Sequence, residues 1–166
     1  MATETVTSRI DSRGVAVVTL NNPNKHNVFD DHLITQISAI FEALEADQSV
    51  RVVILQAEGR SFSAGADLGW MRRMADYSHG ENISDATLMA KMFRRINTLS
   101  KPTIARVQGP AFGGGVGLVA CCDLVFATPA AIFCLSEVKL GLIPAVISPF
   151  VVAAIGARAA RRYCMT

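Results

Sequence analysis

Apolar residues in the first third of the chain follow two different periods. Residues 15–20 form a β-rich apolar run, and the turn signal Asn21-Asn22-Pro23-Asn24 ends it. Asp30 or Asp31 can then cap a helix, because apolar residues recur at helical spacing after them: Leu33, Ile37, Ile40, Phe41 and Leu44. Residues 50–55 are a near-continuous apolar run, typical of a strand buried on both faces. The pattern predicts strand, helix and strand in this order.

The middle of the chain is richer in small and polar side chains. Residues 59–66 form a predicted loop, and a short helix through Trp70 and Met74 follows it. Residues 77–85 are polar, so we expect a mobile surface segment there. Ser84 is the expected cap of the next helix, which carries the apolar residues Leu88, Met92, Ile96 and Leu99.

Strands and helices continue to alternate in the second half. A strand is predicted at residues 103–107, and the glycine cluster at residues 109–117 leads into a helix through Cys122. Two short strands follow at residues 124–127 and 132–135. Short strands separated by helices predict the α/β class, as an open sheet or as a strand–helix spiral.

The most apolar stretch of the chain lies near its end. Residues 140–157 contain two prolines and two glycines, so we expect buried core here and no membrane span. Ser148 followed by Pro149 is the pattern of a helix start, and this helix is predicted to run through about Arg161.

Composition narrows the class of protein. A chain of 166 residues suits one domain, and 51% hydrophobic with 18% charged residues is typical of a globular protein. The net charge of +2 predicts no nucleic-acid partner. Residues 1–11 lack an apolar core, so we expect no signal peptide and a cytoplasmic location. The four cysteines lack metal-site spacing and are expected to be small buried thiols, with no metal.

The glycine cluster at residues 109–117 carries the most chemical information. No G-x-G-x-x-G fits it with correct spacing, and the Lys and Ser/Thr of a P-loop are missing. It is either a close helix–strand packing site or a turn that exposes backbone N–H groups at a helix N-terminus, where they stabilise negative charge. A second small-residue loop at residues 61–67 lies between a strand and a helix in the same way. Two such turns brought together offer two N–H donors to one oxygen, as in an oxyanion hole.

These loops, together with further motifs in the same order, resemble the enoyl-CoA hydratase/isomerase (crotonase) family. The motifs are Asn22-Pro23 to Asn27, residues 62–68, 101–105 and 109–115, Cys122-Asp123-Leu124, and residues 137–144. The resemblance implies a superhelix of repeated β-β-α units that assembles as a trimer or hexamer. It implies an acyl-coenzyme A substrate, with coenzyme A as part of the substrate and no separate cofactor.

The resemblance also assigns site residues. The N–H groups of Ala66 and Gly114 match the family's oxyanion-hole positions. The stretches that match those lining coenzyme A and the thioester contain Lys25, His26, Val28, Ala64, Gly65, Ala66, Asp67, Leu68, Gly113 and Gly114.

Glu137 is the natural proton carrier. It follows a short apolar strand and precedes apolar residues, so its carboxyl should be partly desolvated with a raised pKa. It matches the second of two glutamates in the family's hydratases, whereas the position of the first is Gly117. Glycine at position 117 indicates that a side chain would occupy space needed there, either by a bulky acyl group or by closely packed neighbouring residues. Asp67, at a helix start, is expected to be a cap and not a second acid.

With one glutamate the resemblance is nearest to hydratases of branched or carboxylated acyl groups. Residues 66–71 and 143–149 look like those of bacterial 3-methylglutaconyl-CoA and isohexenylglutaconyl-CoA hydratases. The expected reaction is hydration of a 2-enoyl-CoA, and the alternative is a Δ3,Δ2-enoyl-CoA isomerase that uses Glu137 alone. Trp70 is either core or a wall of the acyl pocket.

The end of the chain leads to a further expectation. The last helix stops without a capping glycine or polar tail, whereas family members continue with helices that close the acyl pocket and build the trimer. We therefore expect residues 1–166 to be an acyl-CoA-binding core that lacks the C-terminal helical part, and an inactive fragment is the alternative to an enzyme.

Overall fold

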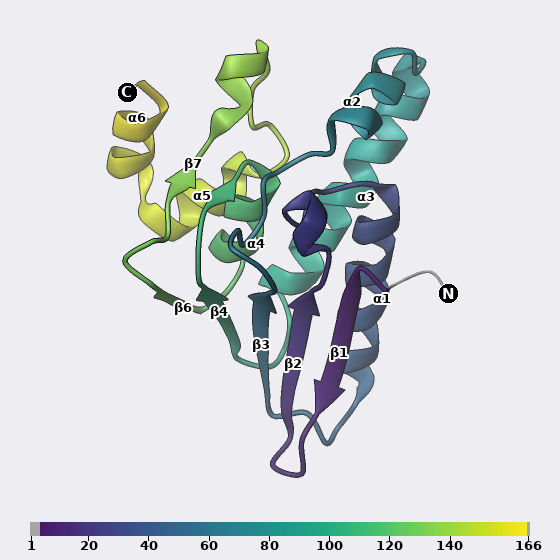
Figure 1. Ribbon diagram of the computed structural model, residues 1–166, viewed down its shortest axis with the longest axis vertical. Coiled ribbons are helices and arrows are strands. Elements are labelled where there is room, and N and C mark those ends of the chain that lie inside the picture. The colour runs from purple at the N-terminus through teal and green to yellow at the C-terminus, as the bar shows by residue number, and fades with distance from the viewer. Residues whose placement is uncertain (1–3, 166) are drawn as a thin grey trace.

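A five-stranded sheet forms one side of the molecule in the computed structural model, which describes residues 4–165 (Figure 1). Its strands lie in the order β1 (Val6–Ile10), β2 (Val15–Leu20), β3 (Val52–Ala57), β4 (Thr103–Val107) and β6 (Leu124–Ala127). Strand β1 is antiparallel to β2, and all other neighbours are parallel. The predicted α/β class is confirmed.

Two helices cover one face of this sheet. Strand β2 alternates buried and half-buried residues, with Ala16, Val18 and Leu20 buried. Helices α1 (Asp31–Ala46) and α3 (His79–Asn97) lie side by side over the sheet in Figure 1 and contact each other. The opposite face is only half buried, because β3 alternates in the same way as β2. The prediction of a strand buried on both faces at residues 50–55 is therefore wrong.

A second set of short parallel pairings runs beside the main sheet. Phe29 bridges to Ala66, Ser63 bridges to Ala111, and β5 (Ala111–Phe112) pairs with β7 (Phe133–Cys134). Each turn of the chain thus contributes a strand to the main sheet, a short stretch to the second set, and then a helix. This is a spiral of β-β-α units, which settles the choice between an open sheet and a spiral.

The remaining elements complete the turns of the spiral. They are η1 (Pro23–Lys25), α2 (Leu68–Ala75), α4 (Gly114–Ala120), η2 (Ser136–Leu140), α5 (Ser148–Ile155) and α6 (Ala157–Met165). The single helix expected from Ser148 to Arg161 is two helices, because Gly156 between them has a positive φ of 80°.

Helix α3 starts earlier than predicted. Ser78, and not Ser84, is its cap: the Ser78 side chain accepts from the N–H of Glu81 at 3.3 Å, and Glu81 accepts from the N–H of Ser78 at 2.7 Å. This reciprocal capping box turns most of the predicted mobile segment at residues 77–85 into helix.

The end of the described chain is less buried than its composition predicts. Ile143 is 79% exposed and Phe126 of β6 is 64% exposed. Other apolar side chains of this C-terminal apolar surface are Leu124, Val125, Ile132, Phe133, Val138, Leu140, Leu142, Val152 and Ile155. The expectation of a buried core at residues 140–157 is wrong for most of these positions. Of the four cysteines predicted to be buried thiols, Cys121 is buried, Cys122 and Cys134 are partly buried, and Cys164 is exposed.

A side-chain clamp joins β4 to the start of β6. The Asp123 carboxylate accepts from the N–H of Thr103 at 2.7 Å and from its hydroxyl at 2.8 Å, and the N–H of Asp123 donates to the Thr103 hydroxyl at 2.9 Å. Thr103 is buried, so its donors have no access to water as a substitute.

Asp123→Ala should lower the free energy of unfolding by about 2–3 kcal/mol, because it leaves the Thr103 N–H and hydroxyl unpaired. Asp123→Asn keeps an acceptor oxygen and should lose less than half of that. Denaturant unfolding followed by circular dichroism measures both, and equal losses for the two variants would contradict the clamp.

Candidate active site

The site lies where the short parallel stretches end and their helices begin. The N–H of Phe29 donates to Gly65 at 2.7 Å, and the N–H of Asp67 donates to Phe29 at 2.7 Å. Because the carbonyl of Gly65 and the N–H of Asp67 both point to Phe29, the N–H of Ala66 between them points to the other side of the strand. It donates no hydrogen bond to any residue that the structure describes.

Gly114 presents a second free donor. It is the first residue of α4, so no earlier helical carbonyl is available to its N–H. The preceding Gly113 has φ 48° and ψ −117°, a conformation for which glycine is strongly favoured. The N–H of Gly113 itself donates to Cys134 at 3.0 Å and ties the turn to β7.

Backbone pairing holds the two loops against each other. The N–H of Phe112 donates to Ser63 at 2.9 Å, and the N–H of Phe62 donates to Pro110 at 2.9 Å. A Cβ on Gly65, whose φ is 87°, would lie 3.2 Å from the carbonyl oxygen of Phe112. The structure therefore brings the Ala66 loop and the Gly114 turn together, as the two-loop hypothesis requires.

Glu137 lies over the same turn. It belongs to η2, directly after β7, and its Oε1 would be 3.0 Å from a Cβ on Gly113. Its Oε2 is buried and has no hydrogen-bond partner in the described part of the chain. Burial raises the pKa of Glu137, and a hydrogen bond from its own backbone N–H lowers it by less. A half-buried carboxyl with a raised pKa beside two free amides can carry a proton to and from a bound carbonyl compound.

The two stretches predicted to line coenzyme A lie next to each other. His26 accepts from the N–H of Ala64 at 2.9 Å, and the Ser63 hydroxyl donates to the carbonyl of Asn27 at 2.8 Å. His26 and Asn27 both have positive φ, near 53° and 52°, so the segment from Lys25 to Val28 turns sharply toward the Ala66 loop.

Sequence reasoning missed Asn27, which organises this corner. Its side chain is buried, donates to the carbonyls of Glu58 and Ser61 at 2.9 and 3.0 Å, and accepts from the N–H of Asn22 at 2.8 Å. An asparagine that follows a turn signal and can adopt a left-handed conformation was the available signal.

Asp67 is the cap of α2, as predicted. Its carboxylate accepts from the N–H of Trp70 at 2.9 Å. That hydrogen bond lowers the pKa of Asp67, and the N–H of Gly69 and the charges of Lys25 and Arg73 lower it further. Asp67 is therefore an ionised cap and no proton donor near neutral pH. Trp70 is buried and Leu68 is exposed.

Gly117 packs closely and leaves no room. It is buried in α4, and a Cβ there would lie 2.5 Å from Cγ2 of Ile147 and 2.9 Å from Cε1 of Phe93. Of the two reasons for glycine at this position, close packing is the one that the structure supports.

The described residues contain no group of three or more His, Cys, Asp and Glu side chains that could hold a metal ion. Burial raises the pKa of Cys122 to about 12 and that of Cys121 further, so both thiols stay neutral. None of the helices from residue 4 to residue 165 is long and apolar enough to cross a membrane.

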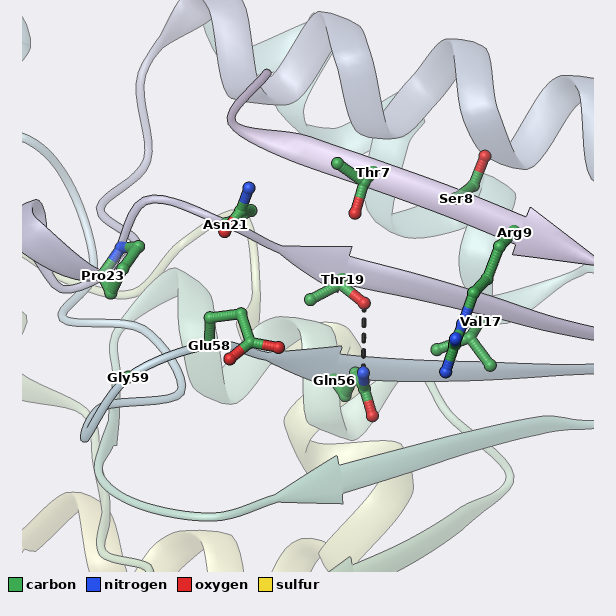
Figure 2. Close-up of a pocket in the computed structure, with 10 residues that line it drawn as sticks. All are labelled: Thr7, Ser8, Arg9, Val17, Thr19, Asn21, Pro23, Gln56, Glu58 and Gly59. Atoms are coloured by element: carbon green, nitrogen blue, oxygen red, sulfur yellow. Dashed lines mark hydrogen bonds between the residues drawn. The ribbon is translucent and has the colours of Figure 1, made fainter. Parts of the chain in front are cut away.

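A shallow groove of about 730 Å³ lies elsewhere, on the face of β1, β2 and β3 that the helices do not cover. Figure 2 shows Thr7, Arg9, Thr19 and Gln56 along its floor, with Gln56 donating to Thr19 at 3.1 Å. The groove includes none of the predicted site residues.

Comparisons with known proteins agree with this geometry. The model of the enoyl-CoA hydratase/isomerase family matches residues 11–166. A crystal structure of an enoyl-CoA hydratase/isomerase (crotonase) type protein from Legionella pneumophila superposes with a TM-score of 0.94 at 48% identity, over 98% of this chain and 62% of that one.

Curated relatives carry the names of two activities. A Thermus thermophilus protein with the name of an enoyl-CoA hydratase is 37% identical over 158 residues, which are 95% of this chain and 62% of that protein. The Dictyostelium discoideum mitochondrial Delta(3,5)-Delta(2,4)-dienoyl-CoA isomerase is 33% identical over 141 residues, 80% of this chain and 48% of that protein.

The chain belongs to the enoyl-CoA hydratase/isomerase family and has the crotonase-like fold. It spans less than two thirds of the length of the relatives that it matches here.

Gly113→Ala should lower the free energy of unfolding by about 1–2 kcal/mol, because it places a side chain at positive φ and against the Glu137 carboxyl. Gly80→Ala is the matched control, since Gly80 lies in α3 with open space around it. Thermal unfolding of both proteins measures the effect, and an equally stable Gly113→Ala protein would refute the constraint.

The raised pKa of Glu137 makes a second prediction. A carboxyl with a higher pKa in the folded than in the unfolded state adds stability below the unfolded pKa, near 4.5, and that stability is lost as the pH rises through the folded pKa. The free energy of unfolding of wild type minus that of Glu137→Gln should therefore fall from pH 4 upward and then level off. A difference that rises with pH would contradict a raised pKa.

Proposed function

We propose that this protein binds an acyl-coenzyme A thioester and stabilises its enolate with the N–H groups of Ala66 and Gly114. One observation carries the proposal: two free backbone donors lie on loops that are hydrogen-bonded to each other, with the Glu137 carboxyl over Gly113. Donors fixed in this way stabilise the charge that develops on a thioester oxygen, and losing one typically costs about a hundredfold or more in rate. The enzymatic character of the family supports the proposal.

The proposed reaction is the addition of water to a 2-enoyl-CoA. Water attacks the β-carbon while Glu137 takes one of its protons, and the electron pair of the C=C bond moves onto the thioester oxygen held by Ala66 and Gly114. The enolate then collapses and takes the proton from Glu137 at the α-carbon. The carboxylate is regenerated, and the net change is one water added.

Coenzyme A is part of the substrate in this proposal, and no separate cofactor is needed. The neighbouring stretches that contain Lys25, His26, Val28, Ala64, Gly65, Asp67 and Leu68 are proposed to hold its adenine and pantetheine. Their closeness, through the hydrogen bond from Ala64 to His26, supports this assignment.

The proposed acyl group is branched or carboxylated, such as 3-methylglutaconyl. The support is the resemblance of residues 66–71 and 143–149 to hydratases of such groups, and the absence of a second glutamate at Gly117. A Δ3,Δ2-enoyl-CoA isomerase is the alternative, because a single carboxylate suffices to move one proton along the acyl chain. The name of the Dictyostelium relative, a dienoyl-CoA isomerase, supports retaining isomerisation as the alternative reaction.

Assembly into a trimer or hexamer is proposed as well. The C-terminal apolar surface supports it, because side chains such as Ile143 and Phe126 are largely exposed in the single chain. Large apolar side chains that are exposed in such number are typical of contacts with other protein.

The function is tested by supplying 3-methylglutaconyl-CoA and a 3-enoyl-CoA and following hydration and double-bond migration separately. Hydration should dominate, and Glu137→Gln should lower its rate by about a hundredfold or more, since the proton carrier is lost. Glu58→Gln, an exposed carboxylate in the groove of Figure 2, is the matched control and should keep the wild-type rate. Unchanged hydration in Glu137→Gln would overturn the mechanism, and migration without hydration would favour the isomerase.

A further inference from the structure

Two glycines of α4 face the same aromatic pair. A Cβ on Gly114 would lie 3.3 Å from the ring of Phe29, and a Cβ on Gly117 would lie 2.9 Å from the ring of Phe93. The two rings are themselves in contact, with centroids 6.2 Å apart. Gly117 is one turn after Gly114, so both lie on one face of the helix that begins with the oxyanion donor.

Ile147 fills the rest of the space at Gly117. Its Cγ2 would be only 2.5 Å from a Cβ there, closer than any side chain tolerates, and both Ile147 and Phe93 are buried. Ile147 belongs to residues 143–149, one of the two stretches that carry the resemblance to hydratases of branched or carboxylated acyl groups. Gly117 and Ile147 are far apart in the chain and lie against each other in the fold.

We propose that Ile147 and Phe93 form an apolar wedge that occupies the space a second carboxylate would need at position 117, so that proton transfer at the site relies on Glu137. The effect of the wedge on proton transfer rests on the proposed function, whereas its steric effect at position 117 follows from the contacts alone. Ile147 is a positioning residue, because it acts by closing the helix face beside Gly114.

The start of α5 holds the wedge in place. The N–H of Val151 and the N–H of Phe150 donate to Ile147 at 3.0 and 3.1 Å. The Ser148 hydroxyl donates to Pro144 at 2.6 Å, and its N–H donates to the same carbonyl at 2.9 Å. The Phe150 ring lies 5.9 Å from that of Phe93, which closes the cluster.

A carboxylate has no favourable place within this cluster. The side chain of a glutamate at position 117 would start with a Cβ that overlaps with Ile147 and Phe93, both of which are apolar and buried. The substitution Gly117→Glu alone should therefore not create a two-carboxylate site. It should unfold the protein at lower temperature.

A double-variant cycle tests the steric part. Gly117→Ala should lower the unfolding temperature by roughly 5 °C or more, because the added Cβ overlaps with Ile147. In a protein that already carries Ile147→Ala and so lacks Cγ2, Gly117→Ala should lower the unfolding temperature by no more than half as much as it does in wild type. Ile147→Val keeps Cγ2 and is the matched control. In that protein, Gly117→Ala should lower the unfolding temperature as much as it does in wild type.

The pH dependence of the reaction tests the functional part. The pH profile of kcat/KM of wild type for the 2-enoyl-CoA substrate should show one carboxyl ionisation on its acidic limb. The combination of Gly117→Glu with Ile147→Ala should show a second one, whereas Ile147→Ala alone should not. A purely structural role of Ile147 would leave the number of ionisations unchanged in all variants.

Two results would overturn the wedge. One is a Gly117→Ala protein as stable as wild type. The other is an equal drop in unfolding temperature on Gly117→Ala in the Ile147→Ala and the Ile147→Val proteins. A wild-type protein that turns over no enoyl-CoA would instead contradict the proposed function, and the unfolding temperatures would still decide whether the wedge exists.

Discussion

The parallel pairing of short stretches between successive turns of the spiral is the constraint on which the site depends. Each turn must hydrogen-bond its short stretch to that of the next before it enters its helix, as Phe29 does with Ala66 and β5 with β7. Parallel pairing aligns the ends of the stretches at one edge. Ala66, Gly114 and Glu137 each lie at or just after such an end, so the pairing brings residues from three turns of the chain to one edge.

The free donors at this edge are backbone N–H groups, and glycines shape the turns that present them. Gly113 is required for two reasons at once, its positive φ and the carboxyl of Glu137 lying against it. A side chain there would disturb the direction of the Gly114 N–H and the position of the Glu137 carboxyl together.

The sequence allowed a prediction of most strands and of the two loops, because their apolar runs and small residues are local signals. One failure was local: the Ser78–Glu81 capping box was a readable signal, but the polarity of the segment was interpreted as a sign of a mobile loop. Other failures depend on partners distant in the chain. The exposure of Ile143, the hub role of Asn27 and the contact between Gly117 and Ile147 depend on where the spiral places each turn, which periodicity does not encode.

Ile147 has one more consequence, because it is both the residue against Gly117 and the start of α5. The position of α5 and that of the N-terminus of α4 are therefore not independent: a contact that fixes α5 also restricts the turn that carries the Gly114 amide. Because thermodynamic linkage is reciprocal, a ligand whose binding to the amides depended on the position of α5 would favour that position by the same free energy. Helix α5 also carries Val152 and Ile155 of the C-terminal apolar surface. The same helix is therefore in contact with α4 on one side and contributes to this surface on the other.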